Sequence, residues 1–338
     1  MSFFEEYCRL WPDRRGSMMV HALDRSCPLC ASRASDPYFV SQDGYDYRRC
    51  RECTLVYVRD PIPMPRWNAH YGERPEVRAL EERRFAAHSA GAASSVDHAR
   101  FEFYLRRLRG VVGDLDGKRY LDVGTFYGDA LEVARLHGLR GRGLEGKERV
   151  ARCARELGRD VVFGTSEDLA SLDLGAPFDI VSAYEILEHA TDPARSLRSI
   201  EGLLAPGGSV IATVPNLANF EIQTLREYCF HLLGGVAITG HVNLFDRATL
   251  ARLLADCGFE VVDVFTQYGS NLLNVHLHQT GRYDRIYCYD SIVAGRETGA
   301  PLDRAVVEAI GTVAPAFHRW EQEQALGPIL GMVARKRG

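Results

Sequence analysis

From Lys118 onward the chain alternates short apolar segments with longer amphipathic ones, and this alternation limits the fold more than any other feature. The apolar segments have the length and residue types of strands, and helical patterns separate the first six. We predict strands at 119–124, 140–145, 160–164, 178–185, 209–215, 259–267 and 328–336. Such an alternation is typical of a doubly wound sheet covered by helices. The predicted fold class is therefore α/β, with a seven-stranded, largely parallel, Rossmann-like sheet.

The rest of the chain divides at a proline-rich joint, "DPIPMPRW", over residues 60–67. Residues before proline avoid the helical region, so a boundary is expected there. We expect an N-terminal module over 1–60, a helical linker or lid over 61–117 and the main domain over 118–338. Within the main domain, segments at about 217–241 and 268–325 exceed ordinary connection lengths and are expected to contact substrate.

Two C-x2-C pairs, Cys27/Cys30 and Cys50/Cys53, lie in the N-terminal module with 19 residues between them. Two knuckles at this separation bring four thiolates to one tetrahedron, which is the preference of structural zinc. Iron suits the same ligand set. A pair of redox-active motifs would instead need a thioredoxin-like βαβ context, which this segment lacks. The module is small, so a zinc-ribbon fold stabilised largely by its metal is predicted.

Composition limits the location and the partners of the chain. The formal charge of −4 gives no help to binding a polyanion, so nucleic acid is an unfavoured partner. No apolar run reaches the length of a membrane span and the N-terminus lacks a leader pattern, so no membrane partner is expected. The remaining cysteines are scattered singly, which favours a cytoplasmic location. The oligomeric state cannot be read from these features.

The segment "YLDVGTFYGDA", residues 120–130, forms a strand, a tight turn and the start of a helix. Ligands of open α/β sheets bind beyond the carboxyl ends of the parallel strands, where this turn lies. A dinucleotide would place its diphosphate here, where Asp122 would repel it and Phe126 would crowd it. S-adenosylmethionine carries an ammonium and a sulfonium and no phosphate, so a carboxylate at the strand end favours it. Glu145 follows 23 residues after Asp122 and can accept both ribose hydroxyls. The alternative for both acids is helix capping.

At this point the sequence resembles the class I S-adenosylmethionine-dependent methyltransferases with an N-terminal zinc-ribbon module, among them small-molecule enzymes of the ubiquinone and natural-product type. The resemblance covers roughly 118–268 and the final strand, and it departs at Phe126, which replaces the middle glycine of the usual turn. It rests on ordered motifs: "LDVGTFYGDAL", "GLEGKERVARCAR", "GTSEDLASL", "FDIVSAYEILEHATDP", "LLAPGGSVIATVPN" and "GHVNLFDRATLARLLADCGFEVVDV".

The resemblance implies a role for particular residues in holding the cofactor. Asp122 would support the ammonium group, while Gly124 and Gly128 would allow close approach of the methionine portion. Glu145 would bind the ribose hydroxyls. The adenine would be bound by residues that follow the third strand, Thr165, Ser166 and Glu167. The backbone of Tyr184, at the end of the fourth strand, would contact the cofactor. Ala205–Gly208 is predicted to be a structural turn before the fifth strand.

Candidates for activating the methyl acceptor lie at the same edge of the sheet. His189 and His241 are candidate general bases, although His189 has the alternative role of bracing its loop. Glu185, Glu188 and His189 form E-x-x-E-H, which resembles the pattern where ubiquinone-type O-methyltransferases are thought to bind a divalent cation. Related sequences carry similar motifs without a metal, so both alternatives stay open.

The sequence thus predicts a methyltransferase that uses S-adenosylmethionine and structural zinc and acts on an oxygen or nitrogen of a small molecule, such as a natural-product intermediate or a nucleotide sugar. Two alternatives remain. A zinc-ribbon RNA methyltransferase would show a continuous basic surface. A regulatory protein that has lost catalysis would bind the cofactor without methylating any acceptor.

Overall fold

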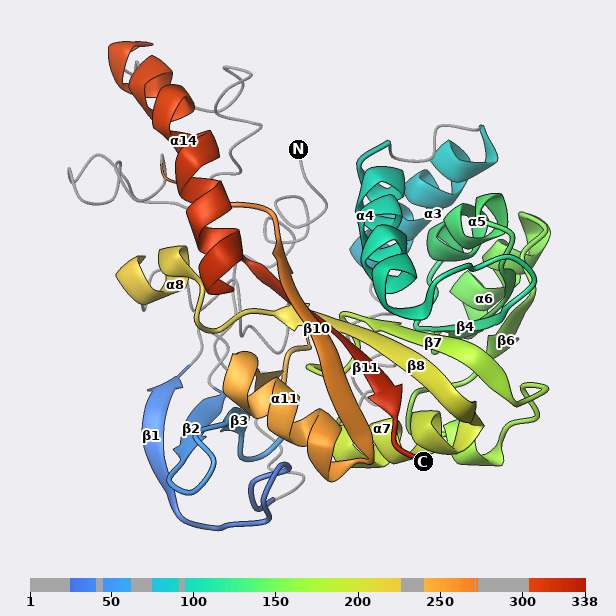
Figure 1. Cartoon of the computed structure of the whole chain (residues 1–338), viewed down its shortest axis with the longest axis horizontal. Coiled ribbons are helices and arrows are strands. Elements are labelled where there is room, and N and C mark those ends of the chain that lie inside the picture. The colour runs from blue at the N-terminus through green and yellow to red at the C-terminus, as the bar shows by residue number, and fades with distance from the viewer. Residues whose placement is uncertain are drawn as a thin grey trace.

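A mixed seven-stranded sheet forms the centre of the computed structural model, which describes residues 25–40, 45–61, 75–90, 95–225, 240–270, 272 and 304–338 (Figure 1). The strands are β4 (Arg119–Val123), β5 (Arg140–Glu145), β6 (Val161–Phe163), β7 (Phe178–Tyr184), β8 (Leu204–Pro215), β10 (Phe259–Gln267) and β11 (Ile329–Lys336). Their order is β10-β11-β8-β7-β4-β5-β6. Only β11 runs antiparallel to its neighbours. The predicted doubly wound, largely parallel sheet is confirmed.

Helices cover both faces of this sheet (Figure 1). They include α4 (Ser95–Val112), α5 (Asp129–Leu136), α6 (Glu148–Glu156), α7 (Pro193–Leu203) and α11 (Arg247–Asp256). Alternate residues of β4 point to opposite faces. Tyr120 packs in the core under α4, α5 and α6, whereas Leu121 packs with Leu197 of α7 and Leu250 of α11. Burial on both faces explains why the central strands β7 and β8 are apolar at most positions.

Two connections differ from the sequence prediction. Between β6 and β7 the chain forms only a short 3-10 turn, η2 (Leu169–Ser171), because Thr165 and Asp168 close a local turn and Gly175 interrupts the segment. The predicted helical separation is therefore wrong there. The fifth strand begins at Leu204, before the predicted Ser209. The expected turn at 205–208 lies inside β8 as an irregularity, since Phe178 pairs with Leu204 and Ile180 with Ser209.

The N-terminal module is a second sheet with the order β1-β2-β3-β9. Its own strands are β1 (Ser35–Val40), β2 (Asp46–Cys50) and β3 (Val56–Val58), and the fourth is β9 (Asn243–Leu244) from the main domain. Val56 pairs with Leu244 and Tyr57 with Asn243. No sequence pattern predicted β9, because a two-residue strand carries no periodic signal. The proposed boundary near residue 60 thus separates strands that share one sheet.

Three further helices lie where a lid and substrate insertions were expected. They are α3 (Pro75–Ser89), α8 (Phe220–Leu225) and α14 (Arg304–Gln324). Residues 62–74, 226–239 and 273–303 of those expected segments lie outside the described residues. Among the helices that the structure describes, none combines the length and the apolar character needed to cross a membrane.

Candidate functional site

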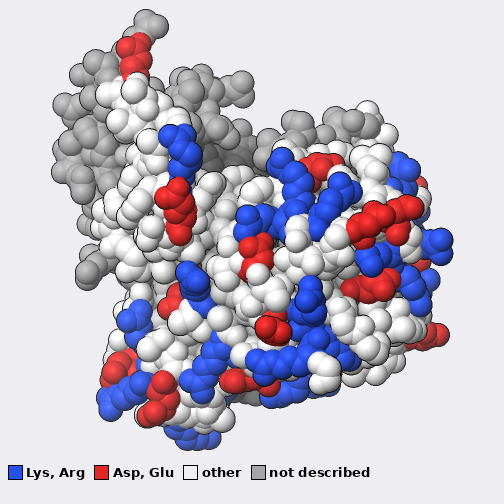
Figure 2. Space-filling view, viewed as in Figure 1, with Lys and Arg blue, Asp and Glu red and all other residues white. Residues whose placement is uncertain are grey.

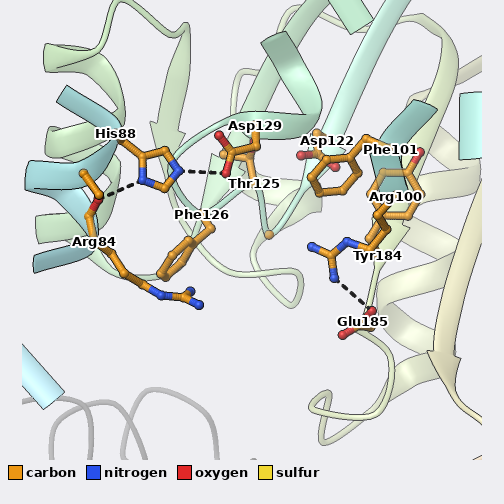
Figure 3. A pocket seen from close by; sticks show the side chains of 12 residues that line it. Arg84, His88, Arg100, Phe101, Asp122, Thr125, Phe126, Asp129, Tyr184 and Glu185 are labelled. Carbon is orange, nitrogen blue, oxygen red and sulfur yellow. Dashed lines mark hydrogen bonds and ion pairs between the residues drawn. The ribbon is translucent and has the colours of Figure 1, made fainter. Parts of the chain in front are cut away.

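A cavity of about 250 Å³ opens at the carboxyl end of β4, where the turn into α5 begins (Figure 3). The sheet contributes Asp122 and Tyr184 to its wall, and helices α3 and α4 contribute Arg84, His88 and Arg100. Three carboxylates, those of Asp122, Asp129 and Glu185, and two guanidinium groups therefore line one cavity. Such a space is complementary to a ligand that carries both a cation and an anion.

Asp122 lies at the floor of this cavity and is 2% exposed. The hydroxyl of Ser182 donates to its Oδ1 at 2.6 Å, and Ser182 in turn lies 2.6 Å from the hydroxyl of Tyr120. Burial raises the pKa of Asp122 to about 6, against the opposing effects of Ser182, Thr125 and the more distant charge of Arg100. The carboxylate is thus held in place by hydrogen bonds and has no counter-ion in direct contact among the described residues.

The turn after β4 needs the left-handed backbone conformation at three positions, with φ of 78° at Gly124, 53° at Phe126 and 87° at Gly128. A Cβ at Gly124 would overlap the side chain of Ile186, and one at Gly128 would lie 2.8 Å from Cγ of Arg159. These two glycines are therefore required by the packing. Phe126 occupies the position where glycine was expected and adopts the uncommon conformation itself.

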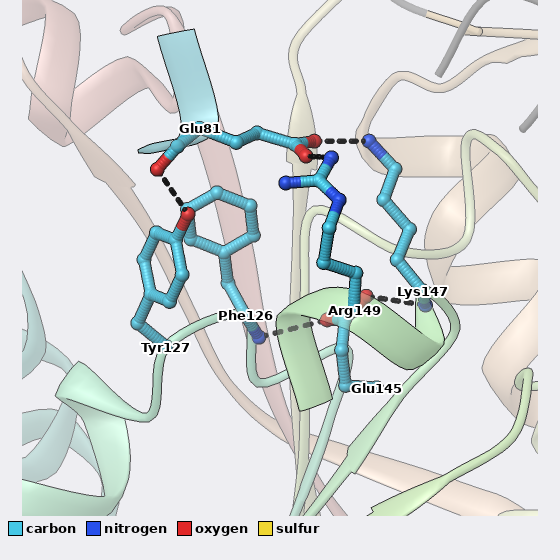
Figure 4. A network of polar contacts seen from close by, with 6 residues as sticks. All are labelled: Glu81, Phe126, Tyr127, Glu145, Lys147 and Arg149. Carbon is cyan, nitrogen blue, oxygen red and sulfur yellow. Dashed lines mark hydrogen bonds and ion pairs between the residues drawn. The ribbon is translucent and has the colours of Figure 1, made fainter. Parts of the chain in front are cut away.

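Glu145 stabilises that conformation (Figure 4). Its Oε2 accepts from the backbone N–H of Phe126 at 2.9 Å, and its Oε1 accepts from the N–H of Lys147, the N-cap of α6, at 2.8 Å. Glu145 is 7% exposed and does not line the cavity. Glu145 thus binds the backbone of the turn and of the residue that precedes α6. Each oxygen keeps a further lone pair for a ligand.

Helix α3 is fastened over the same turn by a buried carboxylate (Figure 4). Glu81 has a side chain 3% exposed, and its oxygens pair with Nζ of Lys147 at 2.9 Å and with the guanidinium of Arg149. The hydroxyl of Tyr127 donates to the backbone oxygen of Glu81 at 2.7 Å. The predicted lid segment therefore contains a helix that contacts the turn at Tyr127 and the start of α6 at Lys147 and Arg149.

Thr165, Ser166 and Glu167, which follow β6 after Gly164, contact other parts of the protein. The backbone N–H and hydroxyl of Thr165 donate to Asp168, at 3.0 and 2.6 Å. Ser166 accepts from Ser196 at 3.4 Å, and the carboxylate of Glu167 accepts from the backbone N–H of Thr191 at 2.9 Å. The last two contacts brace the connection after β7, and none of the three residues lines the cavity.

At the end of β7, Tyr184 and Glu185 line the cavity beside α4 (Figure 3). The ring of Tyr184 stacks on Tyr104 with centroids 4.8 Å apart. Glu185 has a φ of 56°, and its Oε1 lies 3.5 Å from the guanidinium of Arg100. Sequence reasoning missed Arg84, His88 and Arg100, because a basic residue on a helix resembles part of any solvated helix face.

Glu188, His189 and His241 form a second cluster. Each offers one possible metal-ligand atom, and these three atoms lie within 4.8 Å of one another. Oε1 of Glu188 lies 4.0 Å from Nε2 of each histidine, and the two rings are 4.8 Å apart. Glu188 is 1% exposed, and neither of its oxygens has a hydrogen-bond partner among the described residues. Burial raises the pKa of Glu188 well above its usual range and lowers that of His189 to about 4. Glu185 faces Arg100 instead, so His241 takes the place that E-x-x-E-H would give to Glu185.

The four cysteines of the N-terminal module also converge. Sγ of Cys27 lies 3.4 Å from that of Cys53, and Sγ of Cys30 lies 3.5 Å from that of Cys50. All four sulfur atoms lie within 4.8 Å of one another. Four thiols at these separations fit one tetrahedral zinc ion, with no position left open for chemistry. The predicted zinc-ribbon ligand set is thus brought together.

Comparison with known proteins finds a matching family and several similar proteins. A family model described as a methyltransferase domain matches residues 96–264. The ubiquinone biosynthesis O-methyltransferase of Aromatoleum aromaticum is 28% identical over 176 residues, covering 48% of this chain and 72% of that protein. The protein of the same name from Pseudomonas syringae pv. tomato is 30% identical over 168 residues, covering 45% and 68%. A Burkholderia thailandensis structure, 1,6-didemethyltoxoflavin-N1-methyltransferase with S-adenosylhomocysteine, is 17% identical with a TM-score of 0.44, covering 90% of this chain and 100% of that one.

The family match begins in α4 and ends in β10, and it spans half of the 338 residues. It includes β4 with Asp122, the end of β5 and the connection that carries Glu188. The methyl donor of this family is S-adenosylmethionine. By this match and by its strand order, the chain belongs to the methyltransferase family and is a class I S-adenosylmethionine-dependent methyltransferase.

Proposed function

We propose that this enzyme transfers the methyl group of S-adenosylmethionine to a hydroxyl oxygen of a small molecule. One observation carries the proposal: a buried carboxylate, Glu188, lies 4.0 Å from Nε2 of both His189 and His241 on the rim of the sheet. A hydroxyl acceptor needs a proton acceptor, and a neutral imidazole is a suitable one. The oxygen acceptor is also supported by the names of the two relatives.

The cavity beside Asp122 is proposed to hold the amino-acid end of the cofactor. Asp122 would accept from the ammonium group, and Arg100 and Arg84 would attract the carboxylate. Gly124 lines this cavity and, together with Gly128, would allow close approach of the methionine portion of the ligand. When bound, S-adenosylmethionine supplies an electrophilic methyl group at its sulfonium.

The other parts of the cofactor are proposed to meet residues at or after the ends of β5, β6 and β7. Glu145 would accept from the ribose through its remaining lone pairs, and Thr165, Ser166 and Glu167 would border the adenine. The backbone of Tyr184 would face the cofactor beside Glu185. The four cysteines would hold the structural zinc.

This proposal also includes the division of the chain into 1–60, 61–117 and 118–338. It includes a cytoplasmic location, which the layout of the cysteines supports.

The charge distribution supports a small acceptor rather than RNA. In the face shown in Figure 2, basic and acidic side chains are interspersed. Within the ribbon, Arg51 pairs with Asp36 at 2.5 Å, Arg48 lies 3.6 Å from Asp46 and Arg49 lies over the ring of Tyr38. Two of these three arginines thus pair with acids of the module, which reduces the positive charge that the ribbon could offer to RNA phosphates.

A second candidate for acceptor activation is a divalent cation. Both oxygens of Glu188 are buried without a hydrogen-bond partner among the described residues, and two imidazole nitrogens flank them. Glu188, His189 and His241 would hold such an ion, and a bound cation would acidify the acceptor hydroxyl. The ribbon zinc is distinguishable from it, because four thiolates retain zinc under conditions that remove an ion from nitrogen and oxygen ligands.

The experiment supplies labelled S-adenosylmethionine with separate panels of phenols and catechols, sugar nucleotides, amines and transfer RNA. We expect label in a hydroxyl-bearing small molecule, and loss of at least about a hundredfold in turnover for H241N or H189N. The matched control is H137Q, since His137 pairs with Glu102 on a helix away from the cluster. Label only in amines or RNA would contradict the proposal. Turnover lost to a mild chelator and restored by Mn²⁺ or Fe²⁺, which suit imidazole and carboxylate ligands, would select the cation.

A further inference from the structure

We propose that Tyr47 of the zinc ribbon is a positioning residue for His241, so that the ribbon is a working part of the acceptor-activating cluster. This inference rests on the function proposed above for His241. The hydroxyl of Tyr47 donates a 2.6 Å hydrogen bond to the backbone oxygen of His241, across 194 residues of sequence. Tyr47 is 0% exposed, so this bond is shielded from water. It fixes the peptide group from which the imidazole of His241 projects.

The backbone next to His241 is bound to the ribbon as well. The N–H of Val58 donates to the oxygen of Val242 at 2.9 Å, and β9 continues as the fourth strand of the ribbon sheet. Arg25 adds a buried cross-link, since its guanidinium donates to Val58, Val242 and Thr191 at 2.9, 2.8 and 2.6 Å. The ribbon thus grips the chain immediately after His241 by main-chain and side-chain bonds.

The opposite side of the same segment is bound to the connection that carries the rest of the cluster. The N–H of Val242 donates to the oxygen of Glu188 at 2.7 Å. The side chain of Asn243 donates to the oxygens of Leu187 and Ala190, at 3.1 and 2.8 Å. The segment 241–243 therefore lies between the ribbon and residues 187–190. A shift of the ribbon side alters the separation of His241 from Glu188.

The predicted metal and the Tyr47 hydroxyl share one strand. Cys50 ends β2 three residues after Tyr47, and Cys53 follows in the same knuckle. Zinc bound by these thiolates would fix β2 and hence the hydroxyl. A ribbon that served only as an appendage would have no need to place a buried hydroxyl on the carbonyl of a proposed base. The contact accounts for the presence of a metal module in a domain whose sheet is complete without it.

The test compares Y47F with Y57F in the full chain. Both changes remove one hydroxyl from a buried ribbon tyrosine, but that of Tyr57 contacts Ser35 within the ribbon. Amide exchange is followed by mass spectrometry in a peptide covering 241–245, together with the side-chain resonance of His241, assigned by its loss in H241N. We expect exchange about fivefold faster and a shifted His241 resonance in Y47F, with neither in Y57F. Zinc content and affinity for S-adenosylhomocysteine should be unchanged.

Unchanged exchange and an unchanged resonance in Y47F would overturn the inference. If Y47F fails to retain zinc, the wild-type chain stripped of zinc by a chelator decides: faster exchange at 241–245 supports the inference, and protection equal to that of the loaded protein overturns it. The proposed function fails separately, through H241N. A fully active H241N with a released 241–245 segment in Y47F would reject the base and keep the positioning contact.

Discussion

The hydroxyl of Ser182 donates a 2.6 Å hydrogen bond to the carboxylate of Asp122, inside a cavity where that carboxylate is almost fully buried. The bond orients the acid but cannot replace the water it has lost. Burial accordingly raises the pKa of Asp122 from 3.8 to about 6. The folded protein without its ligand thus maintains an unfavourable charge, which a bound ammonium group would neutralise. We therefore expect the charge of Asp122 to increase the affinity for the cofactor and to decrease the stability of the empty protein.

Asparagine at this position should therefore stabilise the empty protein while weakening cofactor binding. A carboxyl group whose pKa is raised on folding destabilises the folded state as pH rises through 3.8 to about 6, by an order of 3 kcal/mol at most. We expect D122N to melt at a higher temperature than the wild type at pH 8, with the advantage disappearing near pH 4. Calorimetry should show at least about tenfold weaker binding of S-adenosylhomocysteine. D256N changes an exposed acid and is the control, so equal gains in both variants would refute the explanation.

His88 should contribute a pH-dependent tie between α3 and α5. Its Nε2 lies 2.9 Å from the carboxylate of Asp129, and this contact raises the pKa of His88 above 6.5. A histidine with a raised pKa stabilises the fold fully below pH 6.5, and this contribution is lost as pH rises through the folded value. The melting temperature of H88Q should fall below that of the wild type at pH 5.5 and approach it at pH 8.5. D129N should abolish the difference, whereas a pH-independent gap would exclude the ion pair.

Local patterns were sufficient to predict the sheet and the turn at its centre. The apolar strands predicted by alternation are confirmed, since burial on two faces leaves a direct signal in the sequence. The two turn glycines were recognisable for a similar reason, because left-handed backbone restricts the residue type. The contact of Tyr47 with His241 spans 194 residues, and that of Arg100 with Glu185 spans 85. Such contacts depend on how the elements pack, and a tyrosine or arginine on an element gives no periodic signal of its partner.

Serine at one ribbon cysteine should remove the metal and much of the folded ribbon. Sγ of Cys50 lies 3.5 Å from that of Cys30, within the predicted zinc ligand set. We expect one zinc per wild-type chain and none in C50S, with loss of protection from exchange over 46–58, because the module depends on its metal. The matched control is C153S, since Cys153 lies on α6 outside the ligand set. Full zinc content in C50S, or iron in the wild type, would contradict the predicted site.

Loss of the charge on Glu81 should release α3 from the start of α6. Its carboxylate pairs with Lys147 and Arg149, and its side chain is only 3% exposed. Glutamine keeps the shape but removes the negative charge that pairs with both cations in a partly buried place, at a cost of about 3 kcal/mol. E81Q should be cleaved faster after Arg83 and Arg84 in limited proteolysis. It should also bind S-adenosylhomocysteine more weakly, because α3 supplies Arg84 and His88 to the cavity. The adjacent E82Q alters an exposed carboxylate and should match the wild type in both measurements. Equal cleavage of E81Q and E82Q would mean that the buried ion pairs do not hold the helix in place.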